Sequence, residues 1–110
     1  MNLVYAVDRL IDTGWTPVDE DMERLPDGRP YPSVAAVEQE FARAGLDLTV
    51  KHNSAFGCYR ATWGPAGENA QAGQADDRHG TVIGSCEREA AVYALAQLRE
   101  AQAERQLEAV

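Results

Sequence analysis

The segment LDLTVKHNSAFGCYRATW, residues 46–63, decides the fold because it predicts a β-hairpin. From Leu46 to Lys51 apolar and polar residues alternate, which is the period of two expected of a strand with one buried face. Asn53-Ser54 supplies a turn, and residues 56–63 form a second strand that Gly64-Pro65 ends. The sequence therefore predicts a β-hairpin at the centre of the fold.

Helical patterns lie on both sides of the hairpin. Before it, Ser33 is a good N-cap residue, Gly45 ends the helix, and the apolar stripe between them consists of Val34, Val37, Phe41 and Ala44. After it, residues 81–86 predict a third strand, and residues 87–105 predict the longest helix of the chain. Strands joined in sequence order favour an antiparallel meander, and two helices on one face would cover it. The sequence therefore predicts an α+β fold with a three-stranded antiparallel sheet and two helices packed on one face.

A short helix and an irregular segment precede this core. Residues 1–13 have apolar residues at three- and four-residue spacing, and residues 15–32 contain four prolines. We expect the second segment to wrap the surface, pinned by Trp15, Leu25 and Tyr31. Residues 64–80 carry no large apolar residue, so we expect a mobile loop there. The 110 residues thus predict one domain: an N-terminal helix and wrapping loop over 1–32, and a core over 33–105.

The order helix–strand–strand–strand–helix over residues 33–105 resembles the double-stranded-RNA-binding domain. The similarity is sharpest at GSCEREAA, residues 84–91, where the family begins its last helix with a Ser-Lys-Lys-x-Ala-Lys pattern. The resemblance implies the same topology, and it places the family's phosphate-gripping lysines at Glu87, Arg88 and Ala91. A carboxylate at such a position repels phosphate, which argues against RNA binding. By analogy, a domain of this shape without the basic surface serves protein contacts.

The net charge also argues against nucleic-acid binding. The chain holds 18 Asp and Glu against 10 Lys and Arg, a net charge of −8. This balance argues against unaided binding to nucleic acid or to an anionic membrane. The sequence has no apolar run of membrane-spanning length and no leader pattern, so we expect a cytoplasmic protein.

Four residues offer metal or nucleophile chemistry: His52, Cys58, His79 and Cys86. A register that joins Trp63 to Thr81 would place Cys58 opposite Cys86, with His52 near the same end of the sheet and His79 at the other. Three ligands, His52, Cys58 and Cys86, could then converge on a metal, or a Cys–His pair could act as a nucleophile. The alternative is two small core cysteines and two surface histidines, and we predict no catalytic residue, metal or cofactor.

Two features could contact a partner. The apolar stripe that includes Leu3, Val7 and Leu10 either packs as a third helix or docks on another protein or a second copy of the chain. The run Asp19-Glu20-Asp21 is either an acidic docking patch or solvated loop charge.

The leading hypothesis is a small acidic interaction or adaptor module that is not an enzyme, with a protein partner, a homodimer being one form. Two alternatives stay open. One is a nucleic-acid-related role, as a degenerate RNA-binding domain or an acidic mimic of nucleic acid. The other is the Cys/His site.

Overall fold

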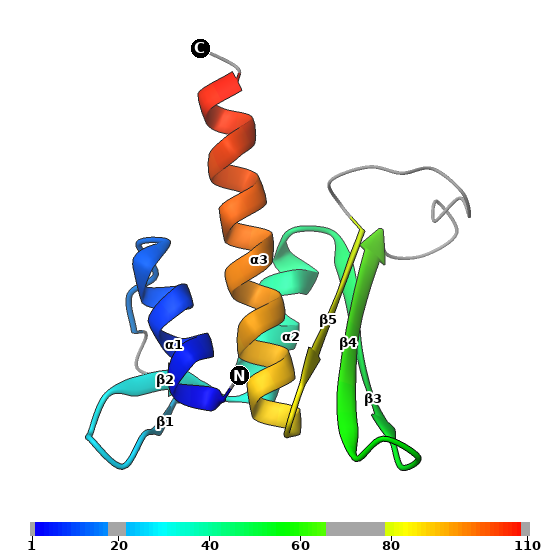
Figure 1. Ribbon diagram of the computed structural model, residues 1–110. Helices are drawn as coiled ribbons and strands as arrows, with labels where there is room; N and C mark the ends of the chain where they lie inside the picture. Colours follow the sequence, from blue (N-terminus) through cyan, green and yellow to red (C-terminus); the bar gives the residue numbers. More distant parts are fainter. Residues whose placement is uncertain (1, 18–21, 66–78, 109–110) are drawn as a thin grey trace.

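The computed structural model describes residues 2–17, 22–65 and 79–108, the last five of these for their backbone only. It is an α+β structure with three helices and two antiparallel sheets among these residues (Figure 1). In chain order the elements are α1 (Leu3–Asp12), β1 (Met22–Arg24), β2 (Pro30–Pro32), α2 (Val34–Arg43), β3 (Leu46–Asn53), β4 (Cys58–Pro65), β5 (Gly80–Gly84) and α3 (Glu87–Glu108).

The predicted hairpin forms the larger sheet, whose strand order is β3-β4-β5. β3 pairs with β4 without interruption from Leu46 opposite Pro65 to Asn53 opposite Cys58. The predicted alternation is confirmed, because Leu46 is buried and Leu48 and Val50 are half-buried, whereas Asp47, Thr49 and Lys51 are exposed. The sheet therefore has one face toward the helices and one open face.

The register between β4 and β5 differs by one residue from the prediction, since Gly80 and not Thr81 stands opposite Trp63. The indole ring of Trp63 lies over Gly80, where an added Cβ would overlap it. Only glycine fits beneath this ring, so the packing of Trp63 selects the register. The strand also starts at Gly80 and β4 runs to Pro65, so the predicted loop is shorter than 64–80, and residues 66–78 lie outside the described part of the chain.

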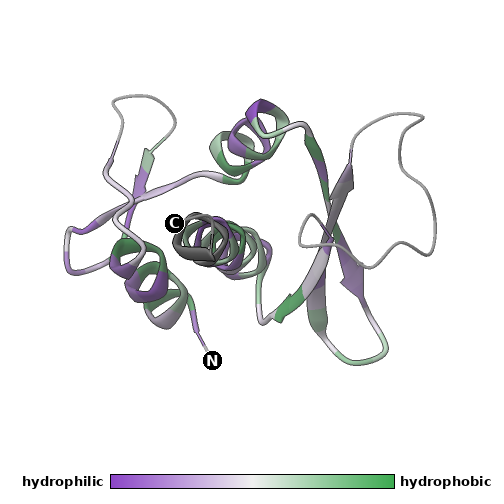
Figure 2. Cartoon of the chain, turned by 90° about the horizontal axis from the view of Figure 1, so that it is seen from above, coloured by the Kyte–Doolittle hydropathy of each residue, from purple (hydrophilic) through white to green (hydrophobic). Residues whose placement is uncertain are grey.

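The helix α3 occupies the middle of the molecule. Seen from above in Figure 2, it has the sheet on one side, the α1 and β1–β2 segment on the other, and α2 beside it. Its buried residues include Ala91, Leu95 and Leu98, and they share one apolar core with the sheet, α1 and α2. Phe41 from α2 meets Trp63 from β4 with ring centroids 5.5 Å apart. The two helices that we expected over the sheet are thus α2 and α3, joined through a single core.

The N-terminal segment packs on α3 and not on the sheet. Val7 and Leu10 of α1 are fully buried, and Arg9 bridges to Glu100 of α3 at 2.6 Å. Trp15, Leu25 and Tyr31 are buried as predicted.

The two-stranded ribbon β1–β2 was not predicted, because its prolines read as strand breakers. Proline has no backbone N–H to donate to a neighbouring strand. In a ribbon of two strands, the nitrogens of Pro30 and Pro32 can face away from the partner strand, where no hydrogen bond is required. Gly28, at φ +92°, allows the tight turn between the strands.

Helix ends follow local chemistry. Ser33 is confirmed as the N-cap of α2, since its hydroxyl accepts the Ala36 N–H at 3.2 Å. Gly45, at φ +77°, ends α2 in the left-handed conformation that glycine adopts without strain. This glycine turns the chain directly into β3.

Candidate functional site

The Cys/His candidates do not come together. His52 stacks on Tyr59, its cross-strand neighbour on the helix side of the sheet, with ring centroids 4.6 Å apart. Cys58 is one residue on, so it projects from the opposite face. Within residues 2–17, 22–65 and 79–108 no three His, Cys, Asp or Glu side chains lie close enough to hold a metal ion. The alternative in which His52, Cys58 and Cys86 converge on a metal ion is therefore wrong, because the strand alternation and the shifted register separate them.

Cys86 has a structural role at the start of α3. Its sulfur accepts the backbone N–H of Glu89 at 3.4 Å, and its carbonyl accepts that of Ala90 at 3.0 Å. This is the position and the bonding of an N-cap residue. The fourth candidate, His79, places its ring over Gly64 at the far end of the sheet.

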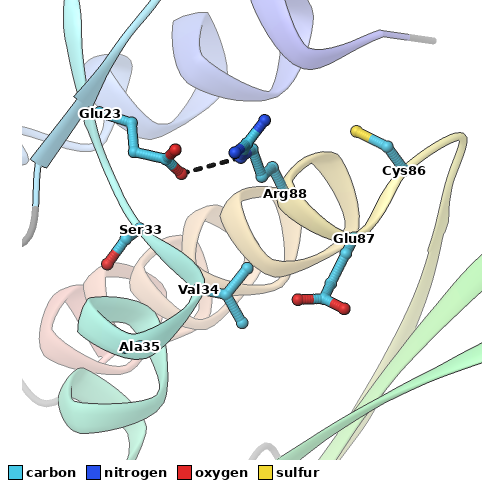
Figure 3. Close-up of a pocket in the computed structure, with 7 residues that line it drawn as sticks. All are labelled: Glu23, Ser33, Val34, Ala35, Cys86, Glu87 and Arg88. Atoms are coloured by element: carbon cyan, nitrogen blue, oxygen red, sulfur yellow. Dashed lines mark hydrogen bonds and ion pairs between the residues drawn. The ribbon is translucent and has the colours of Figure 1, made fainter.

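A hollow of about 520 Å³ lies where α2 and α3 begin (Figure 3). It is lined by Glu23, Ser33, Val34, Ala35, Cys86, Glu87 and Arg88. Figure 3 shows Glu23 reaching from β1 to Arg88, and the two side chains form an ion pair of 2.9 Å. Ser33 and Cys86 each bond within their own helix cap, so four polar side chains around this hollow, those of Ser33, Cys86, Glu23 and Arg88, already have partners.

This hollow contains two of the positions at which the RNA-binding resemblance places phosphate contacts. Glu87 is exposed, Arg88 is the residue paired with Glu23, and the third position, Ala91, is fully buried. The nearby Tyr31 is a buried residue, and burial, together with the charge of Glu23, raises the pKa of its hydroxyl above the ordinary value of 10.0. At two of these three positions the side chain therefore serves the fold, Arg88 through an ion pair and Ala91 through packing.

Glu89 is a buried carboxylate that sequence reasoning missed. Its side chain has no exposed surface, and its two oxygens accept the Ser85 N–H at 2.5 Å and the Ser85 hydroxyl at 3.3 Å. An added Cβ on Gly84 would lie 2.6 Å from this carboxylate, so the glycine makes room for it. The arrangement resembles a capping box, in which an acid in the first turn reaches back over the helix start. The three-residue spacing from Cys86 to Glu89 is that of a capping box and could have identified Glu89, although cysteine is not the usual capping residue.

The predicted interaction residues have two different outcomes. Val7 and Leu10 are buried against α3 and the half-buried Leu3 packs against the same core, so all three join the fold as a third helix, and Val7 and Leu10 offer no surface to a partner. Only Val4 and Ile11 of this stripe stay exposed, at 41% and 40%. The acidic run Asp19-Glu20-Asp21 lies outside the described residues.

The open face of the sheet carries two cations that make no ion pair with the described residues. Lys51 and Arg60 stand directly opposite each other, next to the opposed pair Thr49 and Thr62, and these four residues line a hollow of about 300 Å³. Like charges in directly opposed positions repel each other. Six other arginines with described side chains each make an ion pair or a side-chain hydrogen bond, namely Arg9, Arg24, Arg29, Arg43, Arg88 and Arg99. Lys51 and Arg60 are thus the two described cations that make neither an ion pair nor a side-chain hydrogen bond with the described chain.

The outer edge of β3 is a second candidate for binding, because its outward backbone groups have no strand partner among the described residues. β3 has β4 on one side, and among the described residues no strand pairs with its other side. This edge is eight residues long, longer than a common strand, and it contains no proline and no bulge. A groove of about 440 Å³ runs beside it, lined by Ala35, Glu38, Gln39 and Ala42 of α2 and by Leu46, Asp47 and Leu48 of β3. An edge strand with a groove against a neighbouring helix is a geometry that accepts an added strand.

Comparison with known proteins adds no assignment, since no family model, no curated protein and no solved structure matches this chain. The double-stranded-RNA-binding resemblance stays an expectation from the sequence. Of the helices that the structure describes, none combines the length and the apolar character that crossing a bilayer requires.

Proposed function

We propose that this chain is a protein-binding module of the adaptor kind, that it is not an enzyme, and that it acts in the cytoplasm by accepting an extended segment of its partner along β3. The single observation that carries the proposal is the outer edge of β3, with which no described strand pairs, beside the groove against α2. A bare edge presents unpaired backbone N–H and C=O groups, and a partner strand satisfies them.

The side chains around this edge suit an added strand. On the helix side, the half-buried Leu48 lies where the groove is lined by Ala35 and Ala42, so small apolar side chains of a partner would find contacts there. On the open face, the exposed residues Asp47, Thr49 and Lys51 offer both charges and a hydroxyl. Backbone hydrogen bonds would supply affinity, and these alternating side chains would select the partner.

The test joins capture of a partner with a map of where it binds. A tagged chain is used for pull-down from lysate treated with nuclease, and the purified complex is then studied by hydrogen–deuterium exchange. We expect slower exchange in residues 46–53, because an added strand protects amides that face outward from the edge. Residues of α1 serve as the internal control and should exchange as in the free protein.

Two results would contradict the proposal. One is a partner that protects another surface and leaves residues 46–53 unchanged. The other is capture that nuclease abolishes, which would favour the nucleic-acid-related role in spite of the net charge of −8.

A further inference from the structure

The side chains of β3 are nearly symmetric about Thr49. One residue away on each side stand the apolar Leu48 and Val50, and two residues away stand the opposite charges Asp47 and Lys51. We infer that the outer edge of β3 pairs antiparallel with the same edge of a second copy, with Thr49 facing Thr49 on a two-fold axis. This inference rests on the proposed use of the β3 edge for binding, and it names the occupant.

The two faces of the strand restrict the register of such a pair. Directly opposed residues project from the same face, so a slip of one residue would set the helix-side Leu48 and Val50 against open-face residues. An axis at Leu48 or Val50 keeps the faces but leaves the charges unpaired. An axis at Asp47 or Lys51 would place identical charges opposite each other, which is destabilising. The axis at Thr49 alone forms two Asp47–Lys51 ion pairs.

This pairing resolves the unbalanced charge on the open face. Lys51 faces the cation Arg60 on its inner side, and neither Lys51 nor Asp47 makes an ion pair within the described chain. In the symmetric pair each Lys51 gains a carboxylate from the second copy on its outer side. The charge distribution of the strand is therefore complementary to itself.

The helix side of the edge also fits a second copy. Leu48 and Val50 are only half-buried although they pack against the core. In this register Leu48 of one copy faces Val50 of the other, twice by symmetry, so each partly exposed apolar side chain gains an apolar cover. The groove between α2 and β3 leaves space beside the edge for these side chains.

The result is a six-stranded antiparallel sheet with an isologous two-fold interface. The other sheet edge is β5, which has five residues against the eight of β3. Because the contact is a single strand pair with its neighbouring side chains, it belongs to the small class of interfaces, and we expect a dissociation constant on the order of 10 µM.

The test measures the dimer by sedimentation velocity across loading concentrations from about 1 to about 500 µM, the span that an affinity of this order requires. We expect the wild-type chain to pass from monomer to dimer over this range. Asp47→Lys and Lys51→Asp each replace two attractive pairs with two repulsive ones, and each should weaken the dimer about tenfold or more. The double variant Asp47→Lys with Lys51→Asp restores complementary pairs and should recover most of the wild-type affinity.

A matched control separates local pairing from net charge. Asp12→Lys makes the same change in charge at an exposed position of α1, away from the sheet, and should leave the dimer unchanged. Since Asp47→Lys also lowers the overall repulsion between two chains of charge −8, loss of dimer in this variant cannot come from net charge. Circular dichroism of every variant checks that the fold is retained, and the double variant supplies the answer if one single variant misfolds.

The outcomes of this test and of the proposed function are distinct. A wild-type chain that stays monomeric at about 500 µM, far above the expected dissociation constant, overturns self-pairing. The proposed function is then still decided by the exchange map of a captured partner. Two further results overturn the inference as well. One is a dimer whose dissociation constant is unchanged by both charge reversals. The other is a dimer in which hydrogen–deuterium exchange slows at other residues and not at 46–53.

Discussion

Replacing Glu89 with alanine should destabilise the protein far more than the same change at Glu87, two residues earlier in the first turn of α3. Glu87 is exposed, whereas Glu89 is fully buried and accepts two hydrogen bonds from Ser85. Hydrogen bonds to a charged acceptor contribute about 1.5–3 kcal/mol net of desolvation, and a carboxylate at a helix N-terminus adds about 0.3–1 kcal/mol. The expected loss for Glu89→Ala is therefore about 3 kcal/mol.

This loss is a large share of the total, because a domain of this size is stable by only about 5–15 kcal/mol. It corresponds to a fall in melting temperature on the order of 12 °C. Glu87→Ala gives up only the charge at the helix start, so it should cost about 0.5 kcal/mol. Glu89→Gln keeps an acceptor for the Ser85 N–H but loses the charge, and we expect an intermediate cost of about 1 kcal/mol.

Urea denaturation, followed by circular dichroism and by tryptophan fluorescence, measures these differences, and equal m-values would show that the denatured states are comparable. If Glu89→Ala fails to fold, Glu89→Gln still gives the comparison with Glu87→Ala. A loss at Glu89 within about 0.5 kcal/mol of the loss at Glu87 would show that the buried carboxylate does not hold the start of α3 and would refute the reasoning.

Three further predictions concern the core. Leu95→Asp should abolish folding, because it buries a charge among apolar side chains, whereas Tyr93→Asp, at a half-buried position, should leave a folded protein of lower melting temperature; circular dichroism distinguishes them. Gly80→Ala should cost about 1–3 kcal/mol in urea denaturation, since its methyl group would overlap the Trp63 ring, and an unchanged midpoint would contradict the register argument. The raised pKa of Tyr31 keeps its hydroxyl protonated in the folded state while it ionises in the unfolded state, so stability should fall as pH rises above 10.0, and Tyr31→Phe should reduce that fall.

Much of the local structure could be predicted because it depends on neighbours in sequence. The alternation from Leu46 to Lys51 identified a strand and its buried face, and Ser33 was recognised as a helix cap from its hydroxyl alone. The ribbon β1–β2 was missed because its prolines, which would break a central strand, are harmless in a pair with no further neighbour.

The candidate site was less predictable, since it depends on how distant segments meet. The sequence placed Cys58 opposite Cys86, and a slip of one residue, selected by the fit of Trp63 over Gly80, removed that pairing. Glu87 and Glu89 look alike in the sequence as acids in a first helical turn. Their different roles follow from the position of Gly84, where the sheet ends against the start of α3.

The sequence by itself determined the three helices, the three strands of the larger sheet, their order and the chemistry along β3, including its symmetry about Thr49. These follow from side-chain periodicity and capping, which act over a few residues. Only the tertiary structure decided that Val7 and Leu10 face α3, that Glu89 is buried, and that β3 lies at the edge of its sheet, where no described strand pairs with its outer side. Burial and edge position depend on which surfaces other segments cover, and that is decided when residues far apart in the chain pack into one core.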